Sequence, residues 1–306
     1  MVRRLLILLP LSALAACDPG PARPFGTDPV AEPTLFAPGV VSTGDHEYRI
    51  SFTMDGREAY FTRSDARRRA GPRILVTRVE DGAWSEPQPT SFSTGWEDSP
   101  HLTPDGHQLI YSSRRDMPGW GPVPSNDNLW IVERTGEGWS DPVPLAGEVN
   151  RPRMDGRGTP SHNETGATMF PDGTLLYSTQ ADLAQGEDIY AADPKEGRFV
   201  NARPLLLNAP GNESSPALSP DGTLLVFHGY RDVYATHDDL FVSRRTEYGW
   251  SAPERLPEPV NSPFNDRFAS FSPDGTLLFF SSDRGQDGMS IYYVAVESLS
   301  LSAPPN

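Results

Sequence analysis

Short runs of alternating apolar and polar residues recur along this 306-residue chain, and each recurrence is centred on an Asp-Gly dipeptide. The dipeptides occupy residues 55–56, 105–106, 172–173, 221–222 and 274–275, at spacings of 50, 67, 49 and 53 residues. An alternating segment such as Pro216–Ser219 precedes each dipeptide, and a β-rich run such as Leu224–Phe227 follows it. Asp-Gly between two such runs predicts a β-hairpin, because glycine tolerates the positive φ of a tight turn.

Two further strands are predicted in each repeat. A third apolar run follows at residues 74–76, 129–132, 189–191, 240–242 and 291–294. A fourth begins at Trp-Ser-x-Pro sequences at residues 84–87, 139–142 and 250–253, which repeat three degrades to Phe199–Ala202. Four short strands in a unit of about 50 residues is the pattern of a propeller blade. We therefore predict an all-β fold, a single β-propeller of five four-stranded blades, with six blades as the alternative.

The two ends of the chain predict how the ring closes. The fifth repeat stops after its third strand, whereas residues 35–41 precede the first repeat and resemble the fourth-strand segment Leu256–Val260. We expect this amino-terminal strand to complete the last blade. The propeller would then span residues 34–299, followed by a disordered tail at 300–306.

The repeats resemble the TolB-type, WD-like propeller repeat of exported bacterial proteins. The resemblance rests on Ser219–Leu225 and Ser272–Arg284, and it covers roughly residues 45–296. It implies the propeller fold. It does not imply one function, since such propellers serve as protein-binding platforms and peptidase companions, among other roles.

The first residues have the layout of a secretory signal, with Arg3 and Arg4 before an apolar stretch at residues 5–14. The sequence Leu14–Cys17 resembles a bacterial lipobox, which implies cleavage after residue 16 and lipidation of Cys17. Asp18 then favours retention at the inner membrane over the outer. Residues 17–33 are rich in proline and predict an extended tether. Cys17 is the only cysteine, so no intramolecular disulfide is available.

The charge balance narrows the class of partner. Without residues 1–16 the chain carries 24 basic and 41 acidic residues, a net charge of −17. Such a body repels nucleic acid and anionic lipid. We therefore expect a partner in the cell envelope, a lipid anchor and no nucleic acid.

Blade topology sorts the loops onto two faces. The Asp-Gly turns and the third-to-fourth turns share one face, here called the Asp-Gly face. The second-to-third loops and the blade-to-blade loops share the opposite face, here called the variable-loop face. The extra residues of the long repeat, 115–124 and 150–158, fall on the variable-loop face, where binding loops are expected to vary.

Arginines gather in these loops on an otherwise acidic chain. Arginine forks pair with carboxylates and phosphates, and tryptophan anchors interfaces. We predict that this face binds an acidic protein partner or an anionic glycan. The alternative is that the arginines pair with local aspartates. The candidate residues are Arg67, Arg68, Arg69, Trp120, Arg151, Arg153 and Arg157.

An acidic residue lies eight positions before each repeat aspartate, where each innermost strand is expected to begin. These residues predict an acidic ring around one mouth of the channel. Such a ring could hold a hard cation such as calcium through oxygen ligands. The structural alternative is that each acid bonds backbone amides or an arginine of the next blade. The ring consists of Glu47, Glu97, Glu164, Glu213 and Asp266.

A catalytic function is less favoured than a binding function. Five-bladed propellers include glycosidases that use carboxylates at the channel mouth, but those acids need different environments, and the ring acids look equivalent. No His-x-x-x-His or Gly-x-Ser-x-Gly motif occurs. We predict a non-catalytic binding platform for a protein partner and no cofactor. The alternative is a carbohydrate-binding or glycoside-cleaving propeller that uses Glu97, Asp98, His101 and Glu164.

Overall fold

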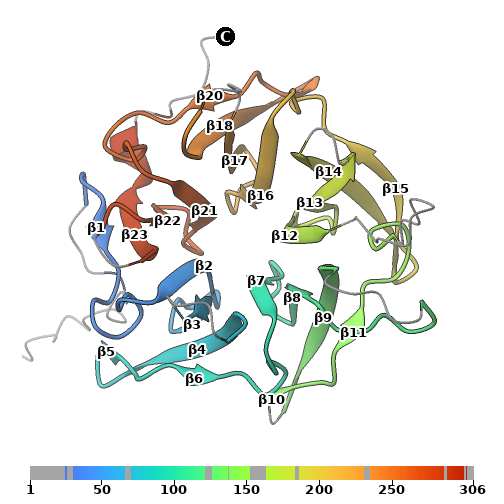
Figure 1. Cartoon of the computed structure of the whole chain (residues 1–306), viewed down its shortest axis with the longest axis horizontal. Helices are drawn as coiled ribbons and strands as arrows, with labels where there is room; N and C mark the ends of the chain where they lie inside the picture. Colours follow the sequence, from blue (N-terminus) through green and yellow to red (C-terminus); the bar gives the residue numbers. More distant parts are fainter. Residues whose placement is uncertain are drawn as a thin grey trace, which may run out of the picture.

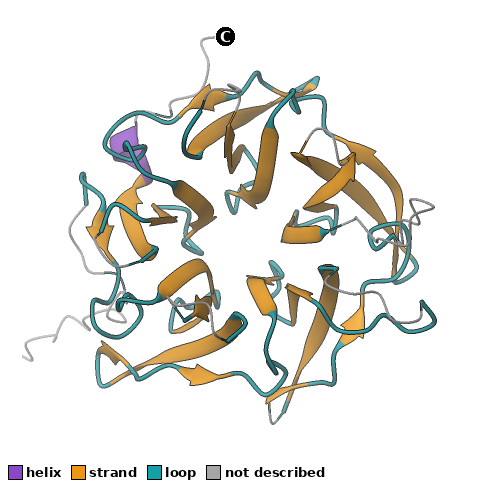
Figure 2. Ribbon diagram, viewed as in Figure 1, coloured by secondary structure: helices purple, strands orange, loops and turns teal. Residues whose placement is uncertain are grey.

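The computed structural model describes residues 25, 30–65, 70–120, 126–136, 138–151, 163–182, 186–230, 235–285, 288–299 and 301, with only the backbone of 181–182. Its strands form five antiparallel sheets arranged around a central axis (Figure 1). One short 3₁₀ helix, η1 (Val296–Leu299), follows the last strand and is the only helix drawn in the described part (Figure 2). The prediction of an all-β propeller with five blades is confirmed.

Each blade is a meander of four strand positions, from the innermost strand outward. Blade 1 contains β2 (His46–Phe52), β3 (Glu58–Ser64), β4 (Arg73–Glu80), β5 (Ala83–Trp84) and β6 (Gln88–Pro89). Blade 2 contains β7 (Glu97–Leu102), β8 (Gln108–Ser113), β9 (Asn128–Thr135), β10 (Gly138–Trp139) and β11 (Val143–Pro144). Blade 3 contains β12 (Glu164–Met169), β13 (Leu175–Asp182), β14 (Gly186–Lys195) and β15 (Arg198–Pro204).

The last two blades follow the same order. Blade 4 contains β16 (Asn212–Leu218), β17 (Leu224–Tyr230), β18 (Asp239–Thr246), β19 (Gly249–Trp250) and β20 (Glu254–Arg255). Blade 5 contains β21 (Asp266–Phe271), β22 (Leu277–Ser282) and β23 (Ser290–Ala295), with β1 (Thr34–Leu35) as its outermost strand. The buried core lies between neighbouring blades: Leu176 and Ile189 of blade 3, for example, pack with Phe227 of blade 4.

The outermost strand differs between blades in a way that proline explains. In blades 1, 2 and 4 it is split into two short pieces, and the proline of each Trp-Ser-x-Pro sequence lies between them. Proline has no N–H to donate to the neighbouring strand. Blade 3 lacks this proline and has the longest outermost strand, β15. The segment that looked degenerate in sequence therefore forms the longest fourth strand, without a break.

Both ends of the chain close the ring in blade 5, as predicted. Thr34 and Leu35 of β1 pair antiparallel with Tyr293 and Tyr292 of β23. After β1, the hydroxyl of Ser42 accepts a hydrogen bond from the Ile291 N–H at 3.2 Å and donates to its carbonyl at 3.1 Å. Asn150, Asn208 and Asn261 bind the third strand in the same two-sided way in blades 2, 3 and 4.

The closure contact predicts a measurable loss of stability. Substitution Ser42→Ala should lower the free energy of unfolding by about 1–2 kcal/mol, because the buried Ile291 N–H loses its acceptor. Urea unfolding followed by tryptophan fluorescence measures the change. Thr34→Ala on exposed β1 is the matched control and should change stability by less than about 0.5 kcal/mol. Equal effects of both substitutions would contradict the role of Ser42.

No helix of the described segments is long and apolar enough to span a bilayer. The predicted signal peptide (1–16) and most of the predicted tether (17–33) lie outside the described residues, as does the tail except for residue 301. Their boundaries stay predictions.

Candidate functional site

A backbone irregularity recurs at the same place in every innermost strand. Two residues after each ring acid, φ is positive, between 49° and 56°, and the pairing register with the second strand shifts there. Such a bulge re-aims side chains and carbonyls. Gly166 shows why the position is tight, because an added Cβ would lie 2.7 Å from the Ser215 Cα. The five residues are Arg49, Ser99, Gly166, Ser215 and Phe268.

Arg49 lies in the central channel. Its guanidinium donates to the carbonyls of Ala167, Ser215, Pro216 and Ala269, at 2.7, 3.1, 2.9 and 3.1 Å. These carbonyls belong to blades 3, 4 and 5, so one side chain of blade 1 binds three other blades. Arg49 is 2% exposed, and burial lowers its pKa to about 10, which leaves it protonated at neutral pH. Arg49 lines one of the two cavities of the channel, the one on the Asp-Gly face.

The opening on the variable-loop face, here called the polar mouth, is a cavity of about 360 Å³. Blades 1, 2 and 5 supply its walls through the starts of their innermost strands and the adjacent loops. Its lining combines carboxylates, arginines and aromatic rings, which is the composition of a site for a polar ligand. The lining residues are His46, Tyr48, Ser64, Ala70, Pro72, Trp96, Asp98, Arg114, Asp127, Arg267, Phe268 and Met289.

Asp98 is the most perturbed acid of the polar mouth. Burial, with the carboxylate of Asp127 nearby, raises the pKa of Asp98 from 3.8 to about 7. The hydroxyl of Tyr48 donates to its carboxyl at 3.4 Å. A carboxyl that titrates near neutral pH can donate or accept a proton or a hydrogen bond there.

Trp96 and Arg114 form one wall of the polar mouth. The guanidinium of Arg114 lies 4.3 Å from the centroid of the Trp96 ring and donates to both oxygens of Asp127, at 3.0 and 3.4 Å. The other partner of the indole is Gly71, where an added Cβ would lie 2.7 Å from the ring. Trp96 nevertheless stays 49% exposed, so this aromatic surface is open to a ligand or partner.

Charged groups of blades 3, 4 and 5 lie near the polar mouth, and of these Arg267 lines the cavity. Arg267 pairs with Asp238 and donates to the amide oxygen of Asn265 at 2.9 Å. Glu187 accepts a hydrogen bond from the Ser214 hydroxyl. Burial, together with Asp127 and Asp238, raises the pKa of Glu187. The two acids that line the polar mouth also differ in environment, because Asp98 is buried whereas Asp127 pairs with Arg114.

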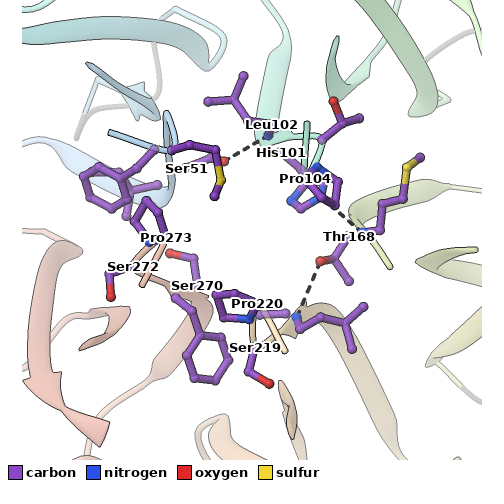
Figure 3. A pocket seen from close by; sticks show the side chains of 18 of the residues that line it. Ser51, His101, Leu102, Pro104, Thr168, Ser219, Pro220, Ser270, Ser272 and Pro273 are labelled. Carbon is purple, nitrogen blue, oxygen red and sulfur yellow. Dashed lines mark hydrogen bonds between the residues drawn. The ribbon is translucent and has the colours of Figure 1, made fainter. Parts of the chain in front are cut away.

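The opening on the Asp-Gly face, here called the apolar mouth, is a cavity of about 340 Å³ (Figure 3). Apolar side chains from the ends of the innermost strands and from the Asp-Gly turns dominate its lining. Four of them are the prolines that precede Asp-Gly, and Met54 takes this place in the first repeat. The apolar lining includes Phe52, Met54, Leu102, Pro104, Met169, Pro171, Leu218, Pro220, Phe271 and Pro273.

His101 lies in the apolar mouth, whereas Asp98 lines the polar mouth. Its Nε2 accepts the Met169 N–H of the next blade at 3.1 Å. Ser51 and Thr168 make the same link from their own blades, as the dashed lines of Figure 3 show. Burial, with Arg49 nearby, lowers the pKa of His101 to about 3. The structure therefore does not join His101 and Asp98 in one site.

The ring acids begin the innermost strands, but their side chains are at most 1% exposed and none lines either mouth. Glu97 accepts the N–H groups of Thr94 and Gly95 at 2.8 and 2.7 Å. Glu47, Glu213 and Asp266 likewise accept an N–H from the preceding loop. Burial raises the pKa of Glu164 well above its usual value. Glu97 and Glu164 are thus shielded from a ligand in the channel.

Arginine partners of the ring acids come from the same blade, whereas the structural alternative placed them in the next blade. Arg63, Arg115 and Arg284 follow or end the second strand of blades 1, 2 and 5. Each pairs with the ring acid of its own sheet, Glu47, Glu97 and Asp266 respectively. In the described part of the chain, no group of three or more histidine, cysteine or acidic side chains could hold a metal ion.

Most of the predicted arginine surface lies outside the described residues: Arg67, Arg68, Arg69, Arg153 and Arg157, as does Cys17. Arg151 is described and pairs with Glu148 at 3.3 Å, with 47% of its side chain exposed. Trp120 packs in part against the core cluster that contains Met117 and Trp130. The partner-binding role of these residues stays a prediction.

Five residues that line the polar mouth were not predicted from the sequence: Tyr48, Trp96, Arg114, Asp127 and Arg267. One signal was available for Tyr48 and Arg267, because strand alternation turns the residue directly after each ring acid to the other face of the sheet, and three of these five residues line the polar mouth. Those residues differ in every blade, unlike the ring acids. They are Tyr48, Asp98, Thr165, Ser214 and Arg267.

Known structures share the fold. No protein-family model matches the chain, and a search of curated proteins finds no match. TolB from Acinetobacter baumannii is similar with a TM-score of 0.51 and 15% identity, over 83% of this chain and 55% of that one. This chain therefore spans just over half the length of that TolB.

Two further structures are similar over more of their length. A putative TolB from Agrobacterium tumefaciens has a TM-score of 0.50 and 20% identity, over 84% of this chain and 79% of that one. An alpha-L-arabinofuranosidase from Lactobacillus brevis has a TM-score of 0.54 and 15% identity, over 84% and 90%. At these identities the likeness shows a shared propeller fold, and it includes both TolB proteins and an enzyme.

Proposed function

We propose that this chain is a periplasm-facing lipoprotein, anchored through Cys17, whose propeller is a non-catalytic binding platform for a protein partner of the cell envelope. The partner docks on the variable-loop face, with the polar mouth at the centre of the interface. The observation that carries the proposal is the polar mouth itself, an open cavity lined by unlike charged and aromatic side chains from three blades. Asp18, directly after the lipidated cysteine, favours the inner membrane over the outer.

Exposed aromatic and aliphatic side chains support this choice of face. Trp96, Leu206, Tyr230 and Phe264 are 49%, 100%, 39% and 48% exposed. All four lie in blade-to-blade loops or at the end of a second strand, and therefore on the variable-loop face. Large apolar side chains near charged groups are typical of interface cores, in which tryptophan and arginine contribute most of the binding energy.

Interface substitutions test the platform. The lipidated protein is captured from gently solubilised membranes, the stoichiometric partner is purified, and its Kd is measured for each variant. Trp96→Ala should weaken binding by about tenfold, because the exposed indole is lost from the centre of the interface. Tyr248→Ala, at an 87% exposed position on the Asp-Gly face, is the control and should leave Kd unchanged. Equal Kd values for both variants would refute the proposed face.

A carbohydrate ligand of the polar mouth is the second candidate. It is favoured by the unlike carboxyls Asp98 and Asp127, since glycoside cleavage needs one acid with a raised pKa beside another carboxylate. Of the four residues predicted for this function, only Asp98 lines the polar mouth, so the test residues are Asp98 and Asp127. This function would be established if the wild-type protein hydrolyses a member of a glycan panel and Asp98→Asn abolishes the hydrolysis. It would be refuted if the wild-type protein hydrolyses none of them.

A further inference from the structure

The chain enters the propeller on the Asp-Gly face. The ring of Phe25 lies 5.0 Å from that of Phe52 and 6.5 Å from that of Trp84, measured between centroids. Phe52 ends the innermost strand β2 beside its Asp-Gly turn, and Trp84 follows the third-to-fourth turn of the same blade. The carbonyl of Val30 accepts the N–H of Ala295, at the Asp-Gly end of β23, at 2.7 Å. Two separate contacts thus place Phe25 and Val30 at this face.

The sequence between Cys17 and Phe25 limits how far a lipid on Cys17 can lie from this point. Eight Cα-to-Cα steps separate them, and a fully extended chain of that length reaches roughly 28 Å. The seven-residue strand β2 separates the two faces by about 23 Å. A chain that ran from Phe25 to the variable-loop face would need almost all of this length. Little length would remain to extend beyond the loops of that face to a membrane.

We infer that the Asp-Gly face is turned toward the lipid bilayer and that the polar mouth opens away from it. The inference rests on the lipid anchor of the proposed function and adds the orientation of the propeller relative to the membrane. A protein partner would then approach the polar mouth from the aqueous side, while the apolar mouth lies over the membrane.

The chemistry of the Asp-Gly face determines how it meets the bilayer. Prolines and Met54 surround the apolar mouth, as Figure 3 shows for three of the prolines. Carboxylates of the Asp-Gly turns lie next to them in sequence. Hydrogen bonds from Thr53 and the Arg57 N–H lower the pKa of Asp55, and Thr103 and the His107 N–H do the same for Asp105. These acids stay charged at neutral pH and repel anionic headgroups. We therefore expect the face to rest over zwitterionic lipid without insertion.

Energy transfer to labelled lipid tests the orientation. The lipidated protein is bound to phosphatidylcholine vesicles that carry an acceptor dye on their headgroups. Cys17 is the only native cysteine and its thiol carries the lipid, so an introduced cysteine accepts a single donor dye. Tyr248→Cys places the donor on the Asp-Gly face, and Leu206→Cys places it on the variable-loop face. The Tyr248 position should give at least about twice the transfer, because about 23 Å of protein separates the faces.

Two further measurements separate the possible failures. If mass spectrometry shows that Cys17 carries no lipid, both the anchor and the orientation are overturned. A lipidated protein with equal transfer from both positions, or more from Leu206, would overturn the orientation alone. Insertion of about 20 flexible residues after Asp18 should bring the two transfer values together, because the longer tether no longer restricts the propeller. An unchanged ratio would show that the tether length does not set the orientation.

Discussion

Substitution Arg49→Met should lower the free energy of unfolding by about 3–5 kcal/mol, because four buried carbonyls lose their donor at once. Methionine keeps a long unbranched side chain, so the space in the channel stays largely filled. Arg49→Lys should cause an intermediate loss, since one ammonium group cannot reach carbonyls of three blades with the geometry of a guanidinium. The backbone has a positive φ at position 49. Arginine, lysine and methionine all carry an unbranched side chain on Cβ, so the backbone strain should be the same across the series.

The midpoint of urea unfolding, followed by tryptophan fluorescence, measures these losses. Arg73→Met is the control, because Arg73 starts β4 with an exposed side chain. It should change stability by less than about 0.5 kcal/mol. If Arg49→Met unfolds at the same urea concentration as Arg73→Met, the buried guanidinium does not stabilise the ring.

Arg49 shows why part of the site could not be predicted from sequence. In the strand His46–Phe52 it looks like any polar residue of an alternating pattern. Its partners are backbone carbonyls, which carry no residue-specific signal, and they lie 118 to 220 residues away along the chain. Only closure of the ring brings them together. The bulge that re-aims this position is likewise a property of the paired strands.

The fold itself was predictable because its signals are local and repeated. Each Asp-Gly dipeptide predicts a tight turn from two neighbouring residues alone. Pro87 and its equivalents mark where the outermost strand is interrupted. The acidic ring was visible for the same reason. However, repetition indicates what every blade needs for folding, and Glu97 is accordingly buried against its own loop. The candidate ligand residues are the unrepeated ones, such as Asp98 and Trp96.

At pH 8, substitution Asp98→Asn should raise the free energy of unfolding by roughly 2–4 kcal/mol, and at pH 4 this gain should disappear. Burial, together with Asp127, raises the pKa of Asp98 to about 7 in the folded protein, against 3.8 for the ordinary side chain. Between these values the unfolded chain has released the proton while the folded chain retains it. The folded state therefore binds more protons, and stability falls as pH rises through this window. Asparagine has the same shape and stays neutral.

Asp55→Asn provides a control of opposite sign on the Asp-Gly face. Hydrogen bonds from Thr53 and the Arg57 N–H lower the pKa of Asp55, so its removal should destabilise the protein at pH 8 and have little effect at low pH. Unfolding midpoints at about pH 2, 4, 6 and 8 test both variants, because the Asp55 contribution is lost only as pH falls below 3.8. An Asp98→Asn effect that is independent of pH would contradict the raised pKa. At pH 8 the carboxylate of Asp98 thus lowers the stability of the folded protein, although it accepts the hydroxyl of Tyr48. Its place in the polar mouth is then best explained by a ligand or partner group that it contacts, since sites are where folds tolerate such a cost.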